Sequence, residues 1–558
     1  MTHFDWNGRL VGYPADRAAH YRASGAWSDA PTGRRLREVA ERHPDRPAVI
    51  SADGRLSYAE LDRRTDQLAA GLVRLGLRQH DPVLLQLTNR LDTVVAWYGV
   101  IKAGLVPVAT LAAHRMHEIS YISAKVGATV HIVEAGTPKF DLVEFALEHA
   151  RGQSQIRQII TVGADSPAAE TVRLEDIGVD IDAATARQVV LDLEDLIDPQ
   201  DVVAFQLSGG TTGVPKVIPR IHAEYWNNGL LYAQRLGWDE DTRVAHLIPL
   251  VHNAGISCAV HAAHAVGGCL VVATPDPETA FELMARTETT DVLLGHGLYR
   301  AVFDERFVPA RKHLRRVILS GAKVPPSLFD HVQADGALAG QLFGMSEGLF
   351  TVTPWDAPES ARLATVGTVI SPEDEIRLLD PGTETPVPHG EVGELCCRGP
   401  YTIPGYFDAA EHNAGAFTSD GFYRSGDLAM MVRLHGEDYL SIEGRIKDVI
   451  NRGGEKINAE EVETLLLRHP GITEAAVVAM PDPRLGERGC AYLVSATGIP
   501  LSMSEIQRHL GDLGVAKYKW PEHLEWVEAL PRSNVGKVDK KWLRNSVAAL
   551  VAESESTA

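Results

Sequence analysis

A chain of 558 residues is too long for one compact domain, and its hydrophobic content of 45% is enough for large buried cores. The net charge of −20 argues against a nucleic-acid-binding surface and favours a cytoplasmic protein. The five cysteines form no CxxC pair, so we expect neither a disulfide framework nor a structural zinc site. The N-terminal stretch has no apolar signal core, and no uncharged run reaches the roughly 18 residues of a membrane span.

Strand-like and helix-like patterns alternate along the first two thirds of the chain. A capping box, Ser57-x-x-Glu60, opens an amphipathic helix that continues to Leu75, and a second helix is expected over Asp92–Ala103. Strands are expected at Ala48–Ser51, Pro82–Leu87, Val106–Ala109, Thr129–Val133, Gln158–Val162, Val202–Leu207, Val244–Ile248, Leu270–Ala273, Val292–Leu294 and Val317–Leu319. Apolar strands that alternate with helices predict an α/β fold of parallel sheets wrapped by helices.

A loop rich in glycine, serine and threonine follows the strand Val202–Leu207 and runs from Ser208 to Lys216. Glycines let backbone N–H groups approach a polyanion closely, hydroxyl groups add donors, and the lysine adds positive charge. A Walker loop places its lysine directly after the last glycine, whereas Val214 and Pro215 intervene here. The sequence therefore predicts a phosphate-binding loop that is not of the P-loop NTPase kind.

The pattern changes after about residue 380. Glu391–Arg398 and Tyr439–Glu443 are typical of a smaller β-rich subdomain over about 380–443, and a charged, glycine-containing stretch then opens a mixed tail. We expect a domain boundary near Gly444, with residues 1–443 forming a large N-terminal domain and residues 444–558 a mobile C-terminal α+β domain.

Five further stretches follow the loop in a fixed order. They are HNAGISC (His252–Cys258), QLFGMSEG (Gln341–Gly348), GFYRSGD (Gly421–Asp427), GRIKDVINRGGEK (Gly444–Lys456) and PRSNVGKV (Pro531–Val538). Together they resemble the adenylate-forming superfamily of acyl-CoA synthetases, non-ribosomal peptide adenylation domains and luciferases. The resemblance runs from about Phe4 to Leu550 and is stronger for stand-alone aryl-acid–AMP ligases, such as the salicylate and 2,3-dihydroxybenzoate ligases of siderophore pathways.

This resemblance implies that an acid carboxylate attacks the α-phosphate of ATP and releases pyrophosphate, so the protein must position and neutralise charge. By resemblance, Glu347 would bind Mg²⁺. The residues that would bind ATP are Ser208, Gly209, Gly210, Thr211, Thr212, Lys216, Gly321, Ala322, Phe343, Gly344, Asp427 and Arg445. Asp427 would accept the ribose hydroxyls, Phe343 would face the adenine, and Lys537 would be the catalytic lysine, reaching the carboxylate and the α-phosphate.

A second arrangement of the tail domain is also implied by the resemblance. Asp448 would be the hinge about which this domain turns, and Gly453 and Gly454 would then line a tunnel for a phosphopantetheine thiol. The acceptor would be an aryl carrier protein, or free coenzyme A if the enzyme is an aryl-CoA ligase. The chain itself contains no carrier motif, so the thiol comes from another molecule.

The acid pocket is expected around His252, a second catalytic candidate, and Asn253, with Ala254, Cys258 and Gly321 as further lining residues. By resemblance, Asn253 would bond an ortho-hydroxyl of an aryl acid, and it stands where amino-acid-activating relatives carry an aspartate. By resemblance, Cys258 stands where 2,3-dihydroxybenzoate ligases tend to carry a serine and salicylate ligases a cysteine. A thiol is larger and bonds more weakly than a hydroxyl, so this residue favours salicylate. Ala254 and its neighbour Gly255 replace an aromatic residue and a proline, which predicts a wider pocket that could accept a substituted or bicyclic aryl acid or a 2-aminobenzoate.

Two alternatives of other kinds remain. A non-catalytic nucleotide-binding homologue would be expected to have lost its central charged residues, yet Lys537, Glu347 and Asp427 are all present. A luciferase-like oxidative enzyme is disfavoured by a pocket that is small and polar.

Overall fold

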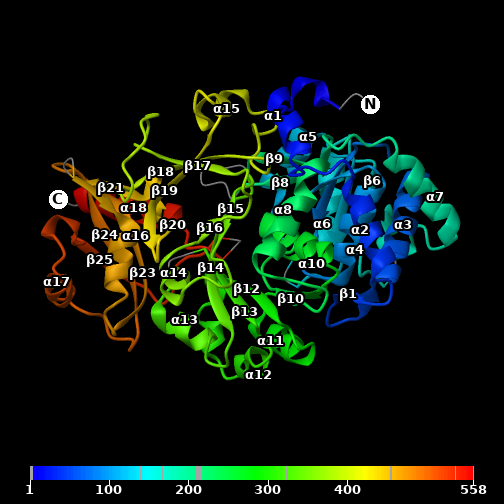
Figure 1. Cartoon of the computed structure of the whole chain (residues 1–558). Helices are drawn as coiled ribbons and strands as arrows, with labels where there is room; N and C mark the ends of the chain where they lie inside the picture. Colours follow the sequence, from blue (N-terminus) through cyan, green and yellow to red (C-terminus); the bar gives the residue numbers. More distant parts are fainter. Residues whose placement is uncertain are drawn as a thin grey trace.

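The structure, a computed structural model, describes residues 4–138, 140–165, 168–208, 215–321, 324–452, 455–533 and 536–556. Within these ranges it contains sheets of nine, seven, five and four strands, with helices packed around the two largest. Figure 1 shows the seven-stranded sheet on one side and the C-terminal part, coloured orange to red, on the other. The expected α/β fold, with a large helix-wrapped N-terminal region and a smaller C-terminal one, is confirmed.

The seven-stranded sheet carries the predicted phosphate loop at one edge. Its strands, in spatial order, are β7 (Thr171–Arg173), β6 (Gln158–Val162), β5 (Val130–Glu134), β3 (Pro82–Gln86), β4 (Val106–Val108), β8 (Val202–Leu207) and β9 (Val217–Ile221). All neighbours are parallel except β8 and β9, which are antiparallel. The loop between residues 208 and 216 therefore joins two adjacent antiparallel strands.

The nine-stranded sheet carries most of the other predicted motifs. Its strands, in spatial order, are β16 (Thr368–Val369), β15 (Phe350–Val352), β14 (Leu338–Gly344), β13 (Arg316–Ser320), β12 (Asp291–Gly295), β10 (Arg243–His246), β11 (Cys269–Val272), β1 (Pro47–Ile50) and β2 (Arg55–Ser57). The central strands from β14 to β1 are parallel. Their carboxyl ends lie at one edge, which is where open α/β sheets bind ligands.

Helices of the N-terminal region share one apolar core with both large sheets. The helices of this region are α1 (Ala15–Ala23), α2 (Thr32–Arg42), α3 (Tyr58–Arg74), α4 (Leu91–Lys102), α5 (Met116–Val126), α6 (Leu142–Gly152), α7 (Ala183–Glu194), α8 (His222–Arg235), α9 (Asn253–Gly255), α10 (Ala262–Ala265), α11 (Pro277–Arg286), α12 (Phe307–Arg311), α13 (Pro326–Val332), α14 (Glu359–Ala364) and α15 (Ala410–Ala416). The predicted capping box opens α3, where the Glu60 backbone N–H donates to Ser57 Oγ at 3.2 Å and the Ser57 N–H donates to Glu60 Oε2 at 2.8 Å. This reciprocal pair satisfies two otherwise free donors at the helix start.

The β-rich subdomain is an antiparallel sheet of β17 (Glu375–Leu379), β18 (Gly393–Arg398), β19 (Tyr423–Leu434) and β20 (Glu437–Arg445). The C-terminal sheet contains β22 (Glu455–Asn458), β21 (Val449–Arg452), β24 (Gly486–Ser495), β23 (Ile472–Asp482) and β25 (His523–Trp526), with helices α16 (Ala459–Leu466), α17 (Met503–Asp512) and α18 (Lys540–Ser556). It has its own apolar core around Ile450 and Leu493. Strand β20 runs one residue past Gly444, so the expected domain boundary falls at the end of a strand.

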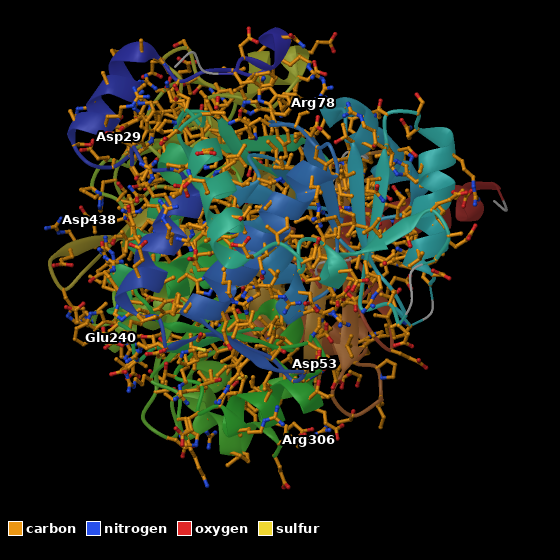
Figure 2. All side chains as sticks on the ribbon, turned by 90° about the vertical axis from the view of Figure 1, so that its right-hand side faces the viewer. Asp29, Asp53, Arg78, Glu240, Arg306 and Asp438 are labelled. Atoms are coloured by element: carbon orange, nitrogen blue, oxygen red, sulfur yellow. The ribbon has the colours of Figure 1, made fainter. Side chains whose placement is uncertain are left out.

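Charged side chains cover the outside of the molecule. Asp29, Asp53, Arg78 and Glu240, which are labelled in Figure 2, are all exposed. No helix among the described residues is long and apolar enough to span a membrane.

Candidate active site

The two ends of the phosphate loop are held together. The Ser208 backbone N–H donates to Lys216 O at 3.0 Å, and the Lys216 N–H donates to Ser208 Oγ at 3.0 Å. Lys216 Nζ lies 5.0 Å from the centroid of the Tyr406 ring. Burial lowers the pKa of Lys216 from its ordinary value, while the carboxylate of Glu347 acts in the opposite direction. Gly209, Gly210, Thr211 and Thr212 lie outside the described residues.

Glu347 lies just beyond β14 and is buried. Tyr406 donates its hydroxyl hydrogen to Glu347 Oε1 at 2.6 Å, and the Tyr423 hydroxyl lies 2.8 Å from that of Tyr406. Within the described ranges no three His, Cys, Asp or Glu side chains converge as a metal site. A single carboxylate still suits Mg²⁺, which usually takes one or two protein carboxylates and completes its shell with phosphate oxygens and water.

Asp427 and Arg445 face each other on the neighbouring strands β19 and β20. Arg445 Nε lies 2.8 Å from Asp427 Oδ1. Burial raises the pKa of Asp427, whereas the positive charges of Arg445 and then Lys537 lower it. The structure thus brings three of the predicted site residues, from both parts of the chain, within electrostatic range of one another.

Lys537 lies on a loop of the C-terminal domain, within electrostatic range of Asp427 and Arg445. Arg532 and Val538 form an antiparallel bridge, and the Ser533 N–H donates to Lys537 O at 2.7 Å. Burial lowers the pKa of Lys537, and the adjacent Arg445 charge lowers it further, while Asp427 opposes the shift. An ammonium group that is influenced by one cation and one anion is a ready partner for an additional negative charge.

Asn253 lies at the start of α9 and is buried in a hydrogen-bonded chain. Gln206 Nε2 donates to the Tyr225 hydroxyl at 2.9 Å, and that hydroxyl donates to Asn253 Oδ1 at 2.8 Å. Asn253 Nδ2 donates to Met345 O at 3.4 Å. This chain fixes the amide orientation, with its oxygen occupied and one amide hydrogen still available.

His252 precedes Asn253 as the N-terminal cap of α9, and its Nδ1 accepts from the Ala254 N–H at 3.3 Å. Burial, with a contribution from the Lys537 charge, lowers the pKa of His252 to about 4. The imidazole is therefore neutral at physiological pH. It can act as a hydrogen-bonding group next to the acid pocket without adding a second positive charge there.

Cys258 is buried in a π-helical segment, Ile256–His261, that continues α9. Burial raises the pKa of its thiol, so the thiol stays protonated and unreactive. Gly255 is needed for packing, because a Cβ atom there would lie 2.1 Å from Leu250 O. The backbone of Leu250 thus fills the space that this glycine leaves, and any widening of the pocket depends on Ala254, which is only half-buried.

The remaining predicted residues lie at the carboxyl ends of β13 and β14 or between β20 and β21, where the hinge is expected. Gly321 follows β13, Phe343 is a half-buried residue near the end of β14, and Gly344 ends that strand. Asp448 ends a short turn between β20 and β21, and its Oδ1 is paired with Arg544 Nη1 at 2.8 Å. Ala322, Gly453 and Gly454 lie outside the described residues.

Two groups of residues that support the site were not predicted from the sequence. Tyr225 and Tyr406 orient Asn253 and Glu347, and only tertiary contacts reveal this. Arg220 and Glu224 form a fully buried ion pair at 2.6 Å, and Arg220 also donates to Ser346 O at 3.0 Å, next to Glu347. An arginine inside the apolar strand VIPRI, four residues before a glutamate, was the available signal for this pair.

Comparison with known proteins places the chain in a family. The "AMP-binding enzyme" family profile matches residues 36–407, and the "AMP-binding enzyme C-terminal domain" profile matches residues 461–537. The chain therefore belongs to the AMP-binding enzyme family and is an adenylate-forming ligase. The expected resemblance to aryl-acid–AMP ligases is confirmed as well.

Several relatives carry names of aryl-acid enzymes. A salicylyl-CoA synthase / salicylate adenylyltransferase from a Streptomyces species is 40% identical over 96% of this chain and 97% of its own length. The 2,3-dihydroxybenzoate-AMP ligase of Bacillus subtilis is 37% identical over 96% of this chain and 97% of its own length. Among solved structures, apo MbtA of Mycobacterium smegmatis matches with a TM-score of 0.73 and 36% identity, over 97% of this chain and 99% of its own.

Proposed function

We propose that the protein activates a 2-hydroxylated aryl acid, with salicylate as the first choice, and passes the aryl group to a phosphopantetheine thiol on an aryl carrier protein. An acid carboxylate oxygen would attack the α-phosphorus of ATP, the bond to the β-phosphate would break, and pyrophosphate would leave. The thiol sulfur would then attack the aryl carbonyl carbon and release AMP. The orientation of the buried Asn253 amide is the observation that carries this proposal, because the preceding residue, His252, lies within electrostatic range of Lys537.

Each charged residue of the site has its own role in the proposed reaction. Lys537 would neutralise charge that develops between the carboxylate and the α-phosphate, and such preorganised groups supply much of enzymatic rate enhancement. Asp427 would accept the ribose hydroxyls, and Lys216 with the Ser208 loop would hold the β- and γ-phosphates. Glu347 would hold Mg²⁺, which supplies positive charge to the triphosphate when it is bound.

The contacts of Asn253 indicate that the substrate acid carries an ortho-hydroxyl group. Its oxygen already accepts from Tyr225 at 2.8 Å and from Ser257 at 3.4 Å, so the amide offers the acid a hydrogen-bond donor and no acceptor. A hydroxyl oxygen accepts such a bond, whereas the lone pair of an aromatic amine is delocalised into the ring. A neutral amide also lacks the charge that would favour an amino-acid ammonium group. The site therefore favours a 2-hydroxy acid over 2-aminobenzoate or an α-amino acid.

The test is acid-dependent ATP–pyrophosphate exchange with salicylate, 2,3-dihydroxybenzoate, 2-aminobenzoate, benzoate and a bicyclic 2-hydroxyaryl acid. We expect the highest kcat/KM with salicylate. A preference for the bicyclic acid would make Ala254 the decisive residue, and a preference for 2-aminobenzoate would contradict the role given to Asn253. No exchange with any acid would overturn the proposed function.

Free coenzyme A is the second candidate acceptor, and the name of the Streptomyces relative includes a CoA synthase activity. Thioester formation measured side by side with coenzyme A and with a phosphopantetheinylated aryl carrier protein decides between them. We expect a higher kcat/KM with the carrier protein.

Changing Cys258 to serine is expected to raise the kcat/KM ratio of 2,3-dihydroxybenzoate to salicylate by about tenfold, because a hydroxyl bonds a 3-hydroxyl better than a thiol does. Exchange rates with both acids measure this ratio. The control is Cys269→Ser, since Cys269 is an equally buried cysteine in β11. An unchanged ratio in Cys258→Ser, or the same change in both variants, would remove Cys258 from acid selection.

Changing Asp448 to proline is expected to slow thioester formation by about tenfold or more and to affect adenylation much less. Proline fixes the φ angle of the residue about which the C-terminal domain is proposed to turn. The two half-reactions are measured separately, and Asp448→Ala serves as the control because it removes only the ion pair with Arg544. Greater damage to adenylation would refute the hinge assignment.

A further inference from the structure

Four charged or polar side chains join the two parts of the chain beside the Lys537 loop. Glu474, on β23 of the C-terminal sheet, accepts from two arginines: its Oε1 lies 3.0 Å from Nη1 of Arg300 in the N-terminal region, and its Oε2 lies 2.5 Å from Nη2 of Arg532. Arg532 Nη1 also lies 3.2 Å from Nδ1 of His296, which again belongs to the N-terminal region. We call these four residues the interdomain clasp.

Arg532 is the centre of the clasp because it also belongs to the loop that carries Lys537. Its Nη1 donates to Gly536 O at 3.1 Å, one residue before Lys537, and its backbone bridges to that of Val538. One guanidinium group thus contacts the loop, the C-terminal sheet and the N-terminal region. Any movement of the C-terminal domain that withdraws Lys537 from the site must separate Arg532 from His296.

His296 joins the clasp to the wall of the active site. It follows β12, and a Cβ atom on Gly321 would lie 3.7 Å from His296 Cβ. Burial and then the positive charges of Arg532 and Lys537 lower the pKa of His296 to about 4. The imidazole is therefore neutral at physiological pH, and its Nδ1 accepts the hydrogen bond from Arg532.

The backbones of the two parts also come together at this point. A Cβ atom on Gly297 would lie 3.6 Å from Gly536 O, so the turn after β12 contacts the Lys537 loop directly. The clasp surrounds this contact with one carboxylate shared between two guanidinium groups. Glu474 is largely shielded from solvent, with 12% of its side chain exposed, so water screens this shared charge less than it would screen a surface pair.

We propose that the clasp positions Lys537 for adenylation, and that it must open before the thioester step. The proposal rests on the function proposed above, in which one arrangement of the C-terminal domain performs adenylation and another performs transfer. Contacts that form in only one of the two domain arrangements increase the population of that arrangement. The size of the increase is set by the free energy of those contacts. Arg300, Glu474, Arg532 and His296 would thus be positioning residues that act through Lys537.

The test uses Arg300→Ala and Glu474→Gln in the full-length protein. Arg300→Ala is expected to lower the kcat of acid-dependent pyrophosphate exchange about fivefold, as for the loss of one ion pair, and Glu474→Gln, which breaks two pairs, at least as much. Both are expected to leave the KM values for ATP and acid within about twofold. Transfer of the aryl group from pre-formed aryl-AMP to the thiol acceptor is expected to stay at the wild-type rate or to rise. Arg300→Lys, which retains the charge, is expected to restore most of the exchange activity.

Arg306→Ala is the matched control. Arg306 is a half-exposed arginine a few residues further along the chain, at the surface in Figure 2, and its partners Asp304 and Glu278 belong to the same region as itself. It is expected to behave as wild type in both half-reactions. The double variant of Arg300→Ala with Glu474→Gln is expected to be no slower than Glu474→Gln alone, because Glu474→Gln already removes the ion pair that Arg300→Ala breaks.

A scattering measurement separates the clasp from the proposed function. Small-angle X-ray scattering of the substrate-free protein is expected to show a larger radius of gyration for Arg300→Ala and Glu474→Gln than for wild type and Arg306→Ala. Wild-type scattering and wild-type exchange in both clasp variants would overturn the clasp, as would an equal fall of both half-reactions. A wild-type protein without acid-dependent exchange would instead overturn the proposed function, while the scattering would still decide whether the clasp holds the domains together.

Discussion

Changing Lys537 to alanine is expected to lower aryl-AMP formation by at least about 100-fold, the effect typical of removing one preorganised charge from a transition state. Transfer from pre-formed aryl-AMP to the thiol acceptor is expected to continue at nearly the wild-type rate. The reason is geometric: Lys537 lies on a loop of the C-terminal domain, within electrostatic range of Asp427 and Arg445, and a rotated domain would no longer place it there. Pyrophosphate exchange measures the first half-reaction, and thioester formation from synthetic aryl-AMP measures the second.

Lys541→Ala provides the control for this experiment, because Lys541 is an exposed lysine on α18 only four residues away. It should leave both half-reactions unchanged. An equal loss of both half-reactions in Lys537→Ala would contradict the two-arrangement mechanism. Retention of exchange in Lys537→Ala would instead remove Lys537 from the list of catalytic residues.

Most of the fold could be predicted from local signals. The capping box at Ser57 and Glu60 sets the start of α3, and the apolar runs over Gln158–Val162 and Val202–Leu207 coincide with β6 and β8. Such elements follow from the spacing of apolar residues and from end signals, which act over a few positions. The antiparallel strands β2, β9, β15 and β16, at or next to the sheet edges, were not predicted, because strand direction depends on where distant segments return to the sheet.

In the candidate site, too, local sequence predicts some features, and others depend on contacts between distant residues. Its motifs were found from residue order, but the contacts that orient them join residues far apart: Tyr406 and Glu347 are 59 positions apart, and Arg532 and His296 are 236 positions apart. No local pattern encodes such pairs. Gly255 is a related case, because the sequence suggested that it widened the acid pocket, whereas the backbone of Leu250 occupies that space.

The second large effect is expected at the buried pair of Arg220 and Glu224. Burial raises the pKa of Glu224, and Arg220 opposes this shift through a contact of 2.6 Å. Arg220→Met would leave the carboxylate without its partner, at a cost of about 3–5 kcal/mol in the free energy of unfolding. Denaturant titration measures this loss, and Arg316→Met is the control, since Arg316 pairs with the buried Asp291 but lies away from Glu347.

The pH dependence of the loss identifies its cause. Without Arg220, the pKa of Glu224 in the folded protein would rise further above its unfolded value, so the carboxyl would be neutral and tolerated at low pH. Stability is then lost as the pH rises through the folded pKa, and the deficit of Arg220→Met should be larger at pH 8 than at pH 5. A deficit that does not change with pH would mean that lost packing, and not the unpaired carboxylate, destabilises the variant.

A double variant, Arg220→Met with Glu224→Leu, then separates stability from function. Replacing both partners by apolar groups is expected to restore much of the stability, because no unpaired charge remains. It does not restore the hydrogen bond from Arg220 to Ser346 O, which holds the backbone next to Glu347. We therefore expect the double variant to fold stably but to need a several-fold higher Mg²⁺ concentration for half-maximal exchange. A wild-type Mg²⁺ requirement would show that Arg220 stabilises the fold without positioning the proposed metal ligand.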